Sequence, residues 1–75
     1  MNNVYKTKDL AEASFLLAEN IELLKIVKEQ GICWFQFRDK SKCEILVKSF
    51  WFQNPPLPAK SYYEAFQTLK KRIYS

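Results

Sequence analysis

Residues 21–38, IELLKIVKEQGICWFQFR, contain the clearest secondary-structure pattern in the sequence. Branched apolar residues dominate the first part, the tripeptide Glu-Gln-Gly supplies a turn, and an extended pattern resumes after it. This arrangement predicts a β-hairpin. On its second strand Cys33, Phe35 and Phe37 alternate with other residues, so they should face a core. The apolar residues of the first strand fall on both faces, which leaves its register open.

Three helices are expected around this hairpin. A broad apolar arc over residues 8–19, preceded by Thr7 as a plausible N-cap, predicts a central helix packed on more than one side. A capping-box sequence at residues 41–44, Ser-Lys-Cys-Glu, predicts the start of a second helix, which the later prolines must end. A third helix should begin either at a second capping box, residues 61–64, or one turn earlier at Pro58.

Together these elements predict one α+β domain spanning residues 1–75, in the order α-β-β-α-α. Residues 4–6 could add a short strand at the edge. A chain of this length buries only about 60% of the surface that its unfolded form exposes, so nearly all large apolar side chains should be needed in the core. Within the first helix, only Lys8, Glu12 and Glu19 are expected to face water clearly.

The residue types present exclude several kinds of active site. The chain has no histidine and its two cysteines, Cys33 and Cys43, lack metal-binding spacing, so neither a zinc site nor a Cys–His nucleophile can be assembled. Acidic residues are scattered, and the single glycine leaves no phosphate-binding loop. We therefore expect no enzyme activity, metal or cofactor, and two free thiols. With no apolar run of about 20 residues and no secretory pattern, a cytoplasmic protein without membrane contact is expected.

Positive charge is concentrated in the second half of the chain. Residues 38–75 contain eight basic and three acidic residues, whereas residues 1–37 contain four and five. On the last helix, tyrosines and basic residues beside the core stripe form a candidate nucleic-acid surface: Lys60, Tyr63, Gln67, Lys70, Lys71, Arg72 and Tyr74. Rings can stack on bases while cations contact phosphates. The alternative is a solvated core edge without a ligand.

A second candidate nucleic-acid surface lies on the hairpin. Trp34, Gln36 and Arg38 project from the face opposite the core residues. An aromatic ring beside a guanidinium group on an open sheet is typical of proteins that read single-stranded RNA. Two strands alone make a poor platform, however, and Trp34 could instead be covered by Lys25 or by the amino-terminal strand.

Apolar side chains of the second helix favour a protein partner. The core stripe of this helix runs from Cys43 to Phe50. Trp51 lies at its margin, whereas Ile45 and Phe52 lie on the opposite side of the helix. They should either meet another element or remain exposed, unless Phe52 is already past the helix end. Ile45, Trp51 and Phe52 are therefore the candidate partner-binding residues.

Three short motifs in this chain resemble a family of short, uncharacterised bacterial proteins, also carried by phages and plasmids and known only as a domain of unknown function. The motifs are an aromatic-Lys-Thr-x-Asp-Leu start at residues 5–10, an aromatic-x-aromatic strand end, and an Ala-x-x-Tyr helix that ends in Leu-Lys and a basic residue. They are matched by Tyr5 to Leu10, by Phe35 and Phe37, and by Ala59, Tyr62, Leu69, Lys70 and Arg72. The resemblance implies a compact α+β module without a known activity or catalytic residues.

The expected function is a small non-enzymatic accessory protein that binds nucleic acid through the basic, aromatic side of its last helix. Presence in mobile elements, which the resemblance implies, also favours the alternative. In that alternative the chain is a protein-interaction module or inhibitor that modulates a host or defence nucleoprotein complex.

Overall fold

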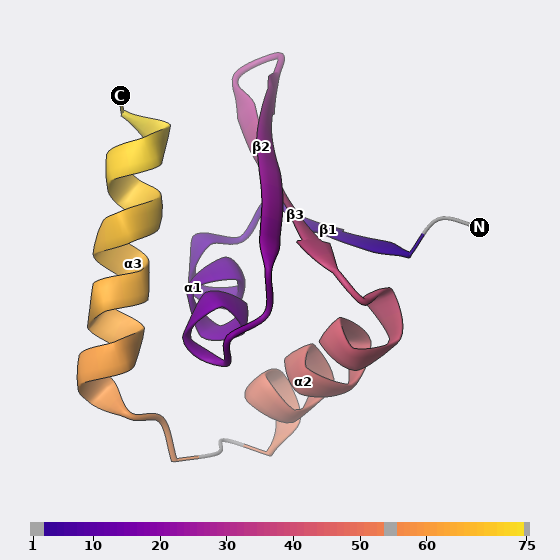
Figure 1. Ribbon diagram of the computed structural model, residues 1–75, viewed down its shortest axis with the longest axis vertical. Coiled ribbons are helices and arrows are strands. Elements are labelled where there is room, and N and C mark those ends of the chain that lie inside the picture. The colour runs from indigo at the N-terminus through magenta and orange to yellow at the C-terminus, as the bar shows by residue number, and fades with distance from the viewer. Residues whose placement is uncertain (1–2, 54–55, 75) are drawn as a thin grey trace.

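The computed structural model describes residues 3–53 and 56–74 and has an α+β fold. Its elements are β1 (Val4–Thr7), α1 (Leu10–Ala18), β2 (Leu23–Glu29), β3 (Ile32–Arg38), α2 (Lys40–Phe52) and α3 (Ala59–Ile73). This order confirms the expected fold class and includes the amino-terminal edge strand. The central position expected for the first helix is also confirmed, because α1 lies between α3 and the sheet (Figure 1).

The sheet is antiparallel, with the strand order β1-β3-β2. The hairpin β2–β3 turns through Gln30 and Gly31, whose φ angles of 49° and 80° are both positive, as a two-residue type I′ turn requires. On the other side of β3, β1 pairs from Val4 opposite Arg38 to Thr7 opposite Phe35. The hairpin is thus extended to three strands, with β3 in the centre.

An irregularity in β2 explains the ambiguous apolar pattern of this strand. Leu23 pairs with Phe37 and Lys25 with Gln36, so Leu24 is an extra residue without a partner in the register. Such a bulge shifts the alternation of side chains by one position. Leu23 and Ile26 can therefore both pack against the core, while Leu24 is exposed.

One buried cluster connects the sheet with all three helices. Its residues are Ala13, Leu16, Ile21, Phe35, Phe37, Cys43 and Leu69. Phe35 and Phe37 are buried as expected, whereas Cys33 on the same face is only half-buried and packs at the edge of the cluster. The alternation along β3 therefore predicted the core face of the sheet.

The carboxyl end of α1 forms a Schellman motif. Asn20 has a φ of 65° and its N–H donates to the carbonyl of Leu17, while the N–H of Ile21 donates to the carbonyl of Leu16. Leu16 and Ile21 are both buried, which supplies the apolar contact that accompanies this motif. The helix ends here because asparagine tolerates positive φ.

Two helices begin at aspartates that were not predicted as caps. The carboxylate of Asp9 accepts the N–H of Glu12 at 3.0 Å, and Thr7, the expected cap, is instead the last residue of β1. For α2, the carboxylate of Asp39 accepts the N–H of Lys42 at 3.3 Å. The capping box predicted at residues 41–44 is therefore wrong, because the N-cap is Asp39, two residues before Ser41.

Cys33 and Cys43 are free thiols, as expected. Cys43 is fully buried, and its Sγ donates to the carbonyl of Arg38 at 3.4 Å. Burial, with smaller contributions from the charges of Asp39 and Glu44, raises the pKa of the Cys43 thiol from its ordinary value of 9.0 to about 11. The folded protein therefore holds this proton more tightly than the unfolded chain does.

Alkaline pH should destabilise the protein through Cys43. Because the folded pKa lies above the unfolded one, this stabilisation is fully present below pH 9 and is lost as pH rises toward 11. At roughly 1.4 kcal/mol per pKa unit, the expected loss between pH 8 and pH 10.5 is about 2 kcal/mol, because the folded-state thiol is not yet fully ionised at pH 10.5. Urea unfolding at pH 8 and pH 10.5 measures it, and Cys43→Ala should show a smaller difference. An equal loss in both proteins would contradict the assignment to this thiol.

Candidate binding surfaces

Helix α3 is positioned mainly by α1. It begins at Ala59 with Pro58 as N-cap, so the earlier of the two expected starts is correct. The hydroxyl of Tyr62 donates to the carbonyl of Ala11 at 3.4 Å, and burial raises the pKa of Tyr62. At the other end of α3, the Nζ of Lys28 donates to the carbonyl of Ile73 at 2.7 Å. A cation at a helix carboxyl end also interacts favourably with the helix dipole.

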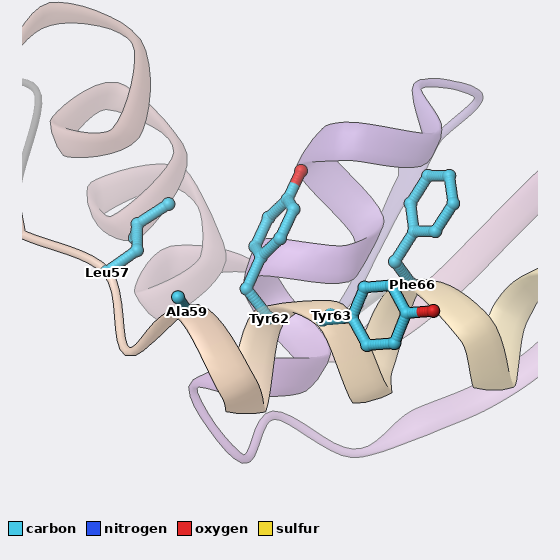
Figure 2. A pocket seen from close by; sticks show the side chains of 5 residues that line it. All are labelled: Leu57, Ala59, Tyr62, Tyr63 and Phe66. Carbon is cyan, nitrogen blue, oxygen red and sulfur yellow. The ribbon is translucent and has the colours of Figure 1, made fainter.

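A hollow of about 590 Å³ lies along the first turns of α3. It is lined by Leu57, Ala59, Tyr62, Tyr63 and Phe66. Figure 2 shows the Tyr62 ring directed toward α1, whereas the Tyr63 ring lies on the outer side of α3. The only polar side-chain atoms of these five residues are the two tyrosine hydroxyls, and that of Tyr62 is already bonded to Ala11. The hollow is therefore almost wholly apolar.

The predicted basic surface of α3 borders this hollow. Tyr63 and Tyr74 are 62% and 79% exposed and lie about 16 Å apart on nearly the same side of the helix. Lys60, Lys70 and Lys71 are also exposed, and the Nζ of Lys70 lies 5.8 Å from the centre of the Phe66 ring. Helical geometry places these residues together with half-buried Gln67. We call Lys60, Tyr63, Gln67, Lys70, Lys71 and Tyr74 the α3 flank.

Arg72 does not join the α3 flank. It lies about 160° around the helix from Lys70, because successive residues of an α-helix are 100° apart. Arg72 lies on the side of α3 that also carries Ser61 and Thr68. Those two residues line a second groove of about 430 Å³ between α3 and the end of α1. The structure thus groups six of the seven predicted α3 residues.

The uncovered face of the sheet carries the second predicted surface. Trp34 and Gln36 lie on this face of β3 and line a smaller hollow of about 250 Å³ together with Lys6 and Glu29. Arg38 lies on the same face, but its Nε is 3.1 Å from Oε1 of Glu22. This exposed ion pair lowers the share of the Arg38 charge that is open to a ligand.

The comparison with protein families supports the expected membership of an uncharacterised domain family. The family described as Domain of unknown function (DUF5659) matches residues 2–75, which is nearly the whole chain. The protein belongs to the DUF5659 family. No curated protein and no solved structure is significantly similar to this DUF5659 chain.

In this DUF5659 protein, Trp51 connects α2 to α1. Its indole N–H donates to Oε2 of Glu12 at 2.9 Å, and its ring lies edge-on to Phe50 with centroids 4.9 Å apart. The Phe50 ring in turn stacks on Phe15 at 4.7 Å. Half of the Trp51 side chain remains exposed, so it is a structural anchor with one free face. Its prediction as a partner-binding residue stays a prediction.

Glu12 was expected to face water, and this prediction is wrong. The residue is buried, and its Oε1 accepts the hydroxyl of Tyr5 at 2.5 Å while Oε2 accepts the N–H of Trp51. Burial, together with the hydrogen bond to Glu12, raises the pKa of Tyr5. This carboxylate therefore joins β1, α1 and α2. Tyr5 and Trp51 can each donate a hydrogen bond to a carboxylate, but they are far apart in the sequence, so the sequence does not indicate that both lie near Glu12.

Ile45 and Phe52 remain outside the packed interior of the DUF5659 fold. Their side chains are 70% and 81% exposed. These values agree with their expected position opposite the core stripe of α2, without testing any partner.

Two absences concern only the described parts of this DUF5659 chain. In residues 3–53 and 56–74, no three or more histidine, cysteine, aspartate or glutamate side chains are grouped so that they could hold a metal ion. Within those same ranges, no helix combines the length and apolar character needed to cross a membrane.

Proposed function

We propose that this DUF5659 protein is a non-enzymatic binding module that takes an acidic amphipathic segment of a partner protein in the hollow of α3. The observation that carries the proposal is the apolar lining of this hollow, which includes the exposed ring of Tyr63. Exposed apolar surface bordered by polar residues is typical of protein interaction sites. An apolar side chain that enters the hollow gains by leaving water.

The chemistry of the hollow favours a protein segment over a nucleobase. A base carries polar edges, and burial of these edges without hydrogen-bond partners costs free energy. The five lining side chains offer only one hydroxyl, that of Tyr63, without a bond inside the protein. Exposed Lys60, next to lining residue Ala59, and Lys70, whose Nζ lies 5.8 Å from the Phe66 ring, would attract acidic side chains of the partner and speed its association.

The source of the partner is part of the same proposal. Carriage by phages and plasmids, which the sequence resemblance implies, would make a host or defence protein the natural target. A small module without its own chemistry acts on such a target by occupying a surface.

The hollow can be tested with a designed peptide. The probe is a fluorescein-labelled 12-residue helix former with leucine at positions i, i+3, i+4 and i+7 and glutamate on its other face. Tyr63→Ala should weaken its binding by about 10-fold, because a central tyrosine in such a contact contributes on the order of 1–2 kcal/mol. Fluorescence anisotropy measures the affinity of each variant.

Matched controls distinguish binding at a specific site from nonspecific binding. Tyr74→Ala removes an even more exposed tyrosine about 16 Å farther along the same helix and should change the affinity less than twofold. A probe with lysine in place of glutamate should bind more weakly than the acidic one. Equal binding by the wild type and Tyr63→Ala, or no binding of the acidic probe at hundreds of micromolar, would contradict the proposal.

Nucleic-acid binding by the α3 flank is the second candidate function. The observation that favours it is the placement of exposed Lys60, Lys70 and Lys71 beside exposed Tyr63 and Tyr74. In this case Lys70→Gln with Lys71→Gln should flatten the dependence of log affinity on log salt for single-stranded oligonucleotides by about 0.7 for each phosphate that is no longer neutralised. An unchanged slope would contradict nucleic-acid binding by the α3 flank and leave protein binding as the proposed function of this surface.

A further inference from the structure

The face of the sheet that no helix covers carries a separate inference. The core cluster takes side chains from only one face, among them Tyr5, Leu23 and Phe35. Residues of the other face, including Trp34 and Gln36, are absent from this cluster and lie half-buried. Two strands alone would be too narrow a platform for a ligand, but β1 makes the platform three strands wide.

The register of the three strands places one lysine on each side of the Gln36 amide. Gln36 on the central strand lies opposite Lys25 on β2 and opposite Lys6 on β1. Neighbouring strands are about 4.8 Å apart, so the backbones at the two lysines are separated by about 10 Å. The result is a row of cation, amide and cation across the sheet.

Trp34 lies beside this row, at a position of β3 that pairs with β2 but not with β1. It is two residues from Gln36 along β3, a distance of about 7 Å, and it faces Val27 on β2. On the other side β1 has already ended, because its last residue, Thr7, pairs with Phe35. The hollow of about 250 Å³ opens at this place and includes Glu29 from the end of β2.

We infer that this face binds single-stranded nucleic acid, with one base stacked on Trp34 and the adjacent phosphates held by Lys6 and Lys25. The Gln36 amide offers both a donor and an acceptor to the edge of the base. Glu29 repels phosphate and can accept from a base amino group, so the base lies on the Glu29 side and the phosphates on the lysine side. The hollow is smaller than the sites of drug-sized ligands, which suits a single ring system.

A protein partner fits this face less well. The apolar residues of this face, among them half-buried Val27 and Trp34 and exposed Ile32, lie to one side of the row. The row itself is polar and charged, so a protein partner would find apolar contact at one end of the face only. Stacking and phosphate attraction, by contrast, need only one exposed ring face and nearby cations. The inference involves none of the residues of the α3 hollow and does not depend on the proposed function.

The test uses fluorescein-labelled 12-nucleotide poly-U RNA and poly-dT DNA, with fluorescence anisotropy at 50 and 200 mM salt. Lys6→Gln and Lys25→Gln should each flatten the slope of log affinity against log salt by about 0.7. Lys48→Gln, which removes the same charge from exposed Lys48 on α2, should leave the slope unchanged. Trp34→Leu should weaken binding by about 5- to 150-fold, and Trp34→Phe should restore most of it.

Several outcomes would overturn the inference. These are no salt-dependent binding at tens of micromolar, equal effects of Lys48→Gln and Lys6→Gln, or loss of binding only in the Lys70→Gln, Lys71→Gln protein. Equally tight binding of a duplex would overturn the preference for single strands. Weaker binding of the acidic peptide by Lys6→Gln would assign the face to a protein partner instead.

Two further measurements keep the experiment decisive. Circular dichroism during heating shows whether Trp34→Leu is folded, and if it is not, the slopes of the lysine variants decide. Unchanged binding of the acidic peptide by Lys6→Gln and Lys25→Gln would show that the sheet surface and the α3 hollow succeed or fail separately.

Discussion

Phe37→Ala should remove about 3–5 kcal/mol from the free energy of unfolding at 25 °C. Phe37 is fully buried on the central strand, between Tyr5 on β1 and Leu23 on β2. Its removal loses the transfer energy of the ring and leaves a cavity that a sheet cannot easily close. Because small domains have only about 5–15 kcal/mol in total, this loss is a large share of the stability.

Phe52→Ala is the matched control for this prediction. The same side chain is deleted, but Phe52 is 81% exposed at the end of α2, so the expected change is within about 0.5 kcal/mol. Urea titration followed by circular dichroism measures both variants. Similar losses in the two proteins would show that Phe37 is not the core residue described above.

Glu12→Ala should cost about 3 kcal/mol, although glutamate to alanine is usually a mild change within a helix. The carboxylate accepts hydrogen bonds from the Tyr5 hydroxyl and the Trp51 indole N–H, and each bond to a charged acceptor contributes about 1.5–3 kcal/mol. Exposure of Trp51 lets water replace part of its bond, which keeps the expected sum near the lower end. Glu12→Gln, which keeps one acceptor oxygen, should cost less.

Glu19→Ala tests whether this effect belongs to Glu12 rather than to any glutamate of α1. Glu19 is exposed at the end of the same helix, and its replacement should change stability by less than about 0.5 kcal/mol. A double-mutant cycle of Glu12→Ala with Trp51→Phe should give a coupling of at least about 0.5 kcal/mol. Additive losses would contradict the hydrogen bond as the source of the stability.

Features that depend on neighbouring residues could be predicted from the sequence. The turn at Gly31, the end of α1 at Asn20 and the core face of β3 each follow from a local preference: positive φ in the first two cases and alternation in the third. Such preferences act within a few residues, so tertiary packing had little to change.

Features that depend on distant residues could not be predicted in this way. A helical wheel places Glu12 toward water because it contains no information about Tyr5 and Trp51, which reach it from β1 and α2. The start of α2 likewise depends on β3. Asp39, the N-cap of α2, has a φ of 67° and directly follows Arg38, the last residue of β3. The capping-box sequence at residues 41–44 competes with the end of β3 in setting where α2 begins. In the structure the end of β3 determines the helix start.

The candidate surfaces were predicted in part. Periodicity correctly placed Tyr63, Tyr74, Ile45 and Phe52 outside the core. The hollow could not be predicted, because one of its walls is Leu57, whose position depends on the path between α2 and α3. The row of Lys25, Gln36 and Lys6 required the bulge in β2 and the pairing of β1, neither of which a single strand reveals.

The position of α1 between the sheet and α3 also determines how the chain can reach its native state. The hairpin joins strands separated by two residues and can form early, within microseconds. The contact of α1 with α3, in contrast, joins residues as far apart as Ala11 and Tyr62. Closing a loop of this length loses chain entropy before any apolar surface is buried, which slows folding. Docking of the last helix is therefore the step that should limit the folding rate. We expect this rate to be well below the folding rate of a helical bundle of equal length.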